Sequence, residues 1–193
     1  MKKILKTTLV LFLSTFLFQS CSSSDDKNSA NNQVSIDGES YSVPSGSVIE
    51  LKMDNMTYDS QLFDRSSIVI TGIKGSRIAT VSFDLFYFDG LPIEGTYTIN
   101  NVLDDDYEFY QDFFSNQKLC AGWTSACNVT QADDTFLINA NNPVGTVTVT
   151  NNGNNNYTIQ YNGNYKVYDD DFNEIDAVPV VLDITTDVIV QSN

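Results

Sequence analysis

Apolar and polar residues alternate along most of the chain after Val34. The clearest stretch is 77–88, where Val81, Phe83 and Leu85 occupy every second position between residues of mixed polarity. Successive side chains of a β-strand point to opposite faces of a sheet, so a period of two predicts strands with one buried face. The body of the protein is therefore predicted to consist of β-strands.

Turn-forming residues separate these stretches at intervals of about 8–12 residues, which is typical of all-β domains. Asp37-Gly38 predicts a tight hairpin turn, because both central residues of a type I′ turn need positive φ. Asn162-Gly163-Asn164 predicts another turn. The predicted strand segments are 34–43 (as a hairpin), 47–53, 66–73, 77–88, 95–99, 136–140, 145–150, 157–161, 165–168 and 177–190.

These segments amount to about nine or ten strands in residues 34–193. They predict a single all-β domain, either an antiparallel β-sandwich or a barrel-like sheet. The stretch near 104–117 is the exception, and we expect a short helical or irregular segment there.

The first twenty residues have a different pattern. Lysines at positions 2, 3 and 6 precede an apolar run over 9–18 that is broken only by Ser14 and Thr15. A membrane-spanning helix needs about 20 apolar residues, so this run is too short to span a bilayer and has the layout of a secretion signal. Residues 1–20 are therefore predicted to be a signal peptide.

The stretch Leu17-Phe18-Gln19-Ser20-Cys21 resembles a lipobox, the cleavage site of bacterial lipoproteins. The resemblance implies that Cys21 becomes the first mature residue and carries a diacylglycerol and a further acyl chain such as palmitate. Several acyl chains give a stable membrane anchor where one would be marginal. Residues 21–33 are polar and are predicted to form a flexible tether.

The cluster Ser22-Ser23-Ser24-Asp25-Asp26 resembles the export signal of Bacteroidetes-type surface lipoproteins, a group that includes many small proteins of unknown function. This resemblance implies an outer-membrane protein that is lipid-anchored and faces the cell surface. A plain solvated linker is the alternative for the same cluster.

Charge and composition exclude several functions. The chain has a net charge of −15, and loss of the three N-terminal lysines leaves seven basic against 25 acidic residues, a net charge of −18. Such a surface repels nucleic acid, so no nucleic-acid partner is expected. The absence of His removes Ser-His-Asp and Cys-His catalysis and the usual zinc ligands.

Three groups of residues are candidates for specific chemistry. With Cys21 acylated, Cys120 and Cys127 remain, and two thiols in an oxidising compartment are predicted to form a disulfide. Trp123 would lie inside that loop, and with Tyr107 and Tyr110 it could form a platform for stacking sugars. The alternative is that Phe109, Phe113 and Phe114 close one open end of the sandwich and Trp123 caps it.

Asp169, Asp171 and Asn173 alternate like the start of a calcium-binding loop. The segment lacks the glycine and glutamate that such a loop has later, so a solvated hairpin tip is the alternative. No other cofactor is expected.

The sequence therefore predicts a non-catalytic, lipid-anchored surface protein that binds a glycan or an outer-membrane partner protein, or that has a structural role. One alternative is an adhesin-like or assembly subunit in which the long C-terminal strand acts by strand addition. A small hydrolase fits less well, because 25 acidic residues single out no catalytic pair.

Overall fold

The structure is a computed structural model that describes residues 32–102, 107–133 and 135–192. The predicted signal peptide, Cys21 and nearly all of the tether lie outside the described residues. The elements are β1 (Gln33–Ile36), β2 (Glu39–Ser42), β3 (Val48–Tyr58), β4 (Gln61–Lys74), β5 (Arg77–Phe88), β6 (Gly95–Asn100), α2 (Tyr107–Asn116), β7 (Lys118–Ala121), β8 (Ala126–Gln131), β9 (Phe136–Val144), β10 (Thr146–Gly153), β11 (Asn156–Tyr168), β12 (Glu174–Asp187) and β13 (Ile189–Ser192).

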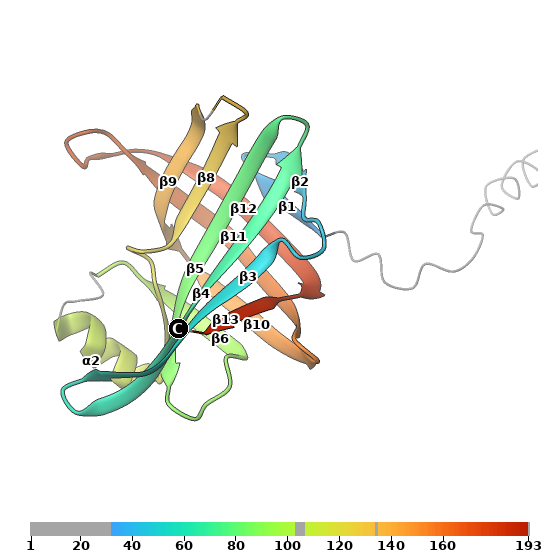
Figure 1. Ribbon diagram of the computed structural model, residues 1–193. Helices are drawn as coiled ribbons and strands as arrows, with labels where there is room; N and C mark the ends of the chain where they lie inside the picture. Colours follow the sequence, from blue (N-terminus) through green and yellow to red (C-terminus); the bar gives the residue numbers. More distant parts are fainter. Residues whose placement is uncertain (1–31, 103–106, 134, 193) are drawn as a thin grey trace, which may run out of the picture.

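The strands pair into one sheet that closes on itself (Figure 1). From β5 the pairings run through β8, β9, β11, β12, β1 and β2 to β4, and β4 pairs back with β5. The predicted all-β, barrel-like domain is thereby confirmed. The pairing is mixed, not purely antiparallel as predicted, since β6–β7 and β3–β13 are parallel.

Two long strands hold the barrel together. Strand β4 pairs along one whole edge of β5, while β8 and β7 share the other edge, opposite residues 77–81 and 84–87 respectively. Strand β11 pairs with β12 along its whole length, and its other edge is divided between β10 and β9. One edge of each of these two long strands, β5 and β11, is thus shared by two shorter strands that lie end to end.

The barrel interior is filled by the alternate positions that the sequence pattern marked as buried. Val81, Phe83 and Leu85 are fully buried and belong to one core cluster with buried residues of β1, β4, β11 and β12. The β1–β2 hairpin confirms the predicted turn, because Asp37 and Gly38 both have positive φ, at 51° and 75°. Burial here follows from the sequence pattern, and the tight turn sets the register of the β1–β2 hairpin.

The predicted turn at Asn162-Gly163-Asn164 is wrong, because β11 passes through these residues without a break. Gly163 serves a close approach instead of a turn. A Cβ atom at this position would lie 2.4 Å from the carbonyl oxygen of Val144 on β9. Glycine inside a strand often marks such a contact between backbones, and sequence alone does not distinguish it from a turn glycine.

Helix α2 confirms the predicted helical segment near 104–117, and residues 103–106 lie outside the described residues. The helix packs against the outer face of the barrel. Its Phe109 and Phe113 are fully buried against Phe63, Phe86 and other apolar residues, in a cluster separate from the barrel core. These rings therefore cover the side of the barrel instead of closing one end.

Candidate functional site

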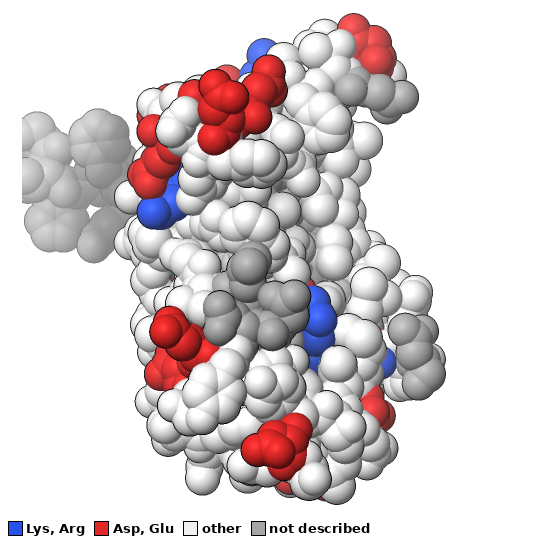
Figure 2. Space-filling view, turned by 90° about the vertical axis from the view of Figure 1, so that its left-hand side faces the viewer, with Lys and Arg blue, Asp and Glu red and all other residues white. Residues whose placement is uncertain are grey.

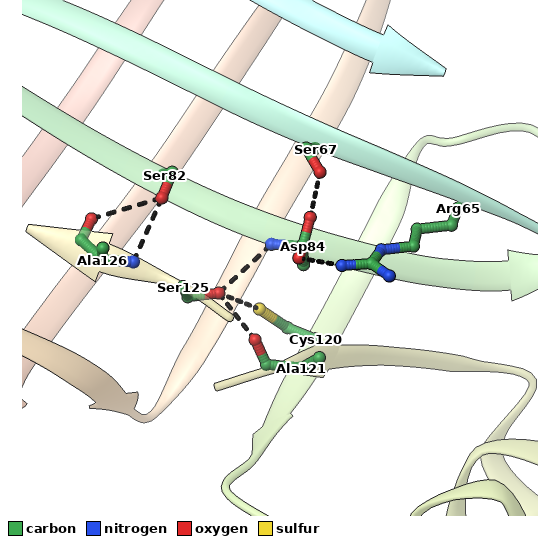
Figure 3. Close-up of polar contacts among 8 residues, drawn as sticks. All are labelled: Arg65, Ser67, Ser82, Asp84, Cys120, Ala121, Ser125 and Ala126. Carbon is green, nitrogen blue, oxygen red and sulfur yellow. Dashed lines mark hydrogen bonds and ion pairs between the residues drawn. The ribbon is translucent and has the colours of Figure 1, made fainter. Parts of the chain in front are cut away.

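The connection that carries Trp123 is fixed to β5 by serine side chains (Figure 3). It crosses the gap between β7 and β8, where part of β5 has no ladder partner on that edge. The Ser82 hydroxyl accepts a hydrogen bond from the Ala126 N–H at 3.1 Å, and the Asp84 N–H donates to Ser125 Oγ at 3.1 Å. Side-chain oxygens thus satisfy backbone groups that the interrupted ladder would leave unpaired.

The same connection is anchored from its other side. Ser125 Oγ donates to the Ala121 carbonyl at 2.7 Å, and the Gly122 N–H donates to the Asn100 carbonyl at 2.7 Å. The carboxylate of Asp84, which is almost fully buried, forms an ion pair with Arg65 at 2.5 Å and accepts a hydrogen bond from Ser67. The loop is therefore held in one conformation, and it presents the Trp123 side chain with 48% of its surface exposed.

Trp123 borders a cleft of about 290 Å³ on the outside of the barrel. The other lining residues are Asn139, Asn141 and Asn142 from β9, Tyr168 at the end of β11, and Asp169 and Phe172 from the β11–β12 connection. Aromatic rings, amides and one carboxylate thus come together from three parts of the chain. Figure 2 views the molecule from the side toward which the tip of the β11–β12 hairpin projects in Figure 1, and shows separate acidic groups with few basic ones.

A β-bulge places Asn142 in the floor of the cleft. The register between β9 and β11 shifts here, and Asn142 has a φ of +47°, a conformation that asparagine tolerates better than most residues. Its side chain is 5% exposed and its Nδ2 donates to the Tyr168 hydroxyl at 3.0 Å. Within the described part of the chain, Asn142 Oδ1 has no hydrogen-bond partner, which is unusual for a buried amide.

The β11–β12 turn is organised around Asp169. Its carboxylate accepts hydrogen bonds from the N–H groups of Asp171 and Asn173, at 3.0 and 2.9 Å, and from the Asn173 side-chain amide. The backbone hydrogen bond from Asn173 is the main cause that lowers the pKa of Asp169 below its ordinary value. Asp169 is therefore ionised at neutral pH and adds a negative acceptor to the cleft.

The same contacts bear on the predicted calcium ligands Asp169, Asp171 and Asn173. Asn173 directs its amide N–H groups at the Asp169 carboxylate, whereas calcium binds oxygen atoms. Across the ranges that the structure describes, no three His, Cys, Asp or Glu side chains are grouped closely enough to hold a metal ion. Calcium binding stays a prediction, and the cluster has a structural role in closing the turn.

Phe172 occupies the tip of this turn in an unfavourable conformation. Its φ is +62°, a region that bulky residues rarely adopt, and 79% of its side chain is exposed. A left-handed conformation costs a non-glycine residue about 1–2 kcal/mol. Burial of the ring does not offset this cost, since the ring remains mostly in solvent.

The predicted Cys120–Cys127 disulfide is wrong, because both cysteines are buried free thiols. Cys120 lies opposite Leu85 and Cys127 opposite Val81, so four residues of β5 separate their positions. This separation is about 13 Å at 3.3 Å per residue, whereas a disulfide joins Cα atoms less than about 7 Å apart. The sequence argument counted thiols, but the strand register decides which of them can meet.

Of the three predicted sugar-binding residues, only Trp123 lines the cleft. Tyr107 and Tyr110 are on α2 and line a different hollow beside the β3–β4 hairpin. Tyr110 stacks on Tyr58 with a centroid distance of 3.7 Å, while Tyr107 is exposed. The structure therefore separates residues that the sequence grouped by proximity along the chain.

Sequence reasoning missed the amides of β9, Tyr168 and Phe172. The available signals were Phe172 within an acidic turn, where a small residue is usual, and the Asn141-Asn142-Pro143 run, which predicts an irregularity in a strand. Neither signal shows that the two segments meet beside Trp123, because that contact depends on the pairing of β9 with β11.

The long C-terminal strand that could act by strand addition is already paired. Strand β12 forms a ladder with β11 along its whole length and also pairs with β1. In the ranges described, no helix is long and apolar enough to cross a membrane. No protein-family model matches the chain, and neither does any curated protein or solved structure.

Proposed function

We propose that this protein is a non-catalytic, lipid-anchored protein of the outer-membrane surface, and that the Trp123 cleft binds glycans. The observation that carries the proposal is the pair of exposed rings, Trp123 and Phe172, that border a cleft lined by amides. Large exposed rings combined with a few polar groups are typical of small-molecule binding sites.

The chemistry of the cleft fits a neutral sugar. The apolar face of a pyranose ring can stack on an indole or phenyl ring. Its hydroxyls can donate to or accept from the amides of Asn139 and Asn141, and can donate to the Asp169 carboxylate. The volume of about 290 Å³ is near the lower limit of roughly 300 Å³ for ligand pockets and suits one or two sugar units. The unpaired Asn142 Oδ1 adds an unused acceptor in the floor.

The same lining argues for binding without catalysis. Glycoside hydrolysis ordinarily uses two carboxyl groups on either side of the scissile bond. Among the described residues that line the cleft, Asp169 is the only carboxylate, and its oxygens already accept hydrogen bonds within the turn. The chain also contains no His to act as an alternative base.

A glycan array of neutral gluco-, galacto-, manno- and xylo-oligosaccharides tests the proposal, followed by titration calorimetry on the sugars retained. The purified mature protein, with its anchor in detergent micelles, should retain at least one class. Trp123→Ala should abolish this retention, while Tyr107→Ala, which removes an exposed ring from the other hollow, should leave it unchanged. Retention of no sugar, or equal losses in both variants, would contradict the glycan proposal.

The anchor has an independent test. In cells that are fed a fatty-acid analogue, the wild-type protein should become labelled. The labelled protein should remain in the membrane fraction. Cys21→Ser should remove both the label and the membrane association, because the acyl chains would have no attachment site. A Cys21→Ser protein that is still labelled would refute lipidation at this residue.

A further inference from the structure

A second cavity lies at one end of the barrel, at the bottom of Figure 1. The β5–β6 loop and the β10–β11 turn are at this end. Its volume is about 270 Å³. Glu50 and Lys52 from β3, Tyr87 from β5 and Tyr157 from β11 are among its lining residues. This cavity is separate from the Trp123 cleft, and the two share no lining residue.

Glu50 is a carboxylate in a position that the strand pattern reserves for the core. It follows the fully buried Val48 at the next inward position of β3 and is itself only 4% exposed. Glu50 Oε1 accepts a hydrogen bond from Ser66 Oγ at 2.7 Å, and Ser66 Oγ also lies 2.9 Å from the Tyr87 hydroxyl. Burial raises the pKa of Tyr87 to about 12, so this hydroxyl stays neutral.

The charges around this cavity do not balance. Asp64 on β4, directly opposite Tyr87 in the ladder, is also buried. Lys52 lines the cavity, but its ammonium group forms an ion pair with the Asp54 carboxylate at 2.6 Å. In the part of the chain that the structure describes, Glu50 has no ion-pair partner.

Burying a carboxylate without a counter-charge is costly, and proteins normally pair or neutralise such groups. A cation that enters the cavity would supply the missing charge. The half-buried Tyr157 also lines this space, and aromatic rings attract ammonium groups through the negative face of the ring. The net negative charge of the whole chain raises the local concentration of cations near the opening.

We propose that the end of the barrel binds a small organic ligand through a primary or secondary ammonium group, with Glu50 as its counter-ion and Tyr157 as an aromatic wall. The ligand's ammonium group donates to the Glu50 carboxylate, and its apolar portion packs beneath Leu91 and Ile93 of the β5–β6 loop. The site does not depend on glycan binding at Trp123.

Three probes of similar size and different charge test this proposal. Titration calorimetry compares 2-phenylethylamine, 2-phenylethanol and phenylacetate on the wild-type protein, and methylamine tests the ammonium group alone. The amine should bind at least tenfold more tightly than the alcohol or the carboxylate, because only the amine supplies the counter-charge. Equal binding of amine and alcohol, or binding of none of the four probes, would overturn the proposal.

Glu50→Gln removes the charge but retains an oxygen that can accept from Ser66, and it should weaken amine binding by a factor of about ten or more. Glu94→Gln is the matched control, because Glu94 is exposed on the same loop region and does not line the cavity. This control should change affinity by less than about twofold, since exposed charges contribute little. Equal losses in both variants would show general attraction of cations and no site at Glu50. If Glu50→Gln fails to fold, the comparison of probes on the wild type decides alone.

Discussion

Two aromatic regions lie outside the barrel, and they differ in what surrounds their rings. In the cluster under α2, the rings of Phe63, Phe86 and Phe113 are buried and contact one another at centroid distances of 5.5–5.9 Å. In the cleft, Trp123 and Phe172 are exposed, and the described residues include no ring stacked on either. Amides, a carboxylate and Tyr168 complete the lining there.

The difference shows that residue type does not decide the role of an aromatic side chain. Rings that meet other rings remove their surface from water and stabilise the fold. The cleft rings leave their surface available, although Phe172 also has an unfavourable backbone conformation. Changes in the α2 cluster should therefore lower stability and leave glycan binding intact. Changes in the cleft rings should weaken glycan binding and have a smaller effect on stability.

The largest effect is expected in the α2 cluster. Phe113→Ala should lower the free energy of unfolding by about 3–5 kcal/mol, because it leaves a cavity where a fully buried ring touches four others. Urea denaturation followed by circular dichroism measures this change. Glycan binding by the folded fraction should persist, and a loss below about 1 kcal/mol would contradict the structural role of the cluster.

The barrel core, which contains both remaining cysteines, should respond to alkaline pH. Burial raises the pKa of Cys120 and Cys127 from 9.0 to about 12, so the folded state keeps both thiols protonated after the unfolded chain has lost its protons. The stability that these thiols contribute is complete below pH 9 and falls between pH 9 and 12, by about 1.4 kcal/mol per pH unit for each thiol.

Urea unfolding at pH 8, 9 and 10 measures this fall in stability. Glycan affinity of the Trp123 cleft, measured at the same pH values, gives the comparison. The double variant Cys120→Ala, Cys127→Ala should lose less stability between pH 9 and 10 than the wild type, because its tyrosines and lysines still titrate there but the two buried thiols are gone. An identical slope in both proteins would show that the thiols are not buried as the structure places them.

The next effect concerns Trp123, in the cleft. Trp123→Ala should reduce glycan affinity at least tenfold, which corresponds to about 1.4 kcal/mol or more. The free energy of unfolding should fall by no more than about 1–2 kcal/mol, well below the effect of Phe113→Ala, because about half of this side chain is already in solvent. Calorimetric titration and urea denaturation of the same preparation separate the two quantities, and a large loss of stability would place Trp123 with the packed rings instead.

The smallest effect is expected at a single residue of the cleft, Phe172. Phe172→Gly should raise the free energy of unfolding by about 1 kcal/mol, because glycine adopts positive φ without strain, and should weaken glycan binding. Phe172→Ala removes the same ring but retains a Cβ, so it should weaken binding without the gain in stability. Equal stabilities of the Gly and Ala variants would contradict the explanation by backbone strain.

Much of the fold follows from local pattern. The alternation over 77–88 predicts β5 with its bounds, and Asp37-Gly38 predicts the turn that the positive φ angles confirm. The helix over 107–116 lies within the segment that interrupts the alternation. Gly163 and the two cysteines show the limit, because their roles depend on which strand lies beside them.

The site shows the same limit more strongly. Trp123 is identifiable from its type and its surroundings in the chain, but the residues that complete the cleft are 16 to 49 positions further along. Glu50 has the period of a core residue, and the sequence offers no sign that it lines a cavity. Neither site could be assembled without knowing how the sheet closes.

The sequence by itself determined the local preferences of this chain: the period of two, the tight turns, the helical interruption, the excess of acidic residues and the N-terminal pattern that predicts a lipid anchor. Tertiary structure alone decided which strands are neighbours, and hence that Cys120 and Cys127 stay apart while Trp123 and Phe172 line the same cleft. The physical reason is that side-chain periodicity is encoded within each strand, whereas register and closure arise from packing between strands far apart in the chain.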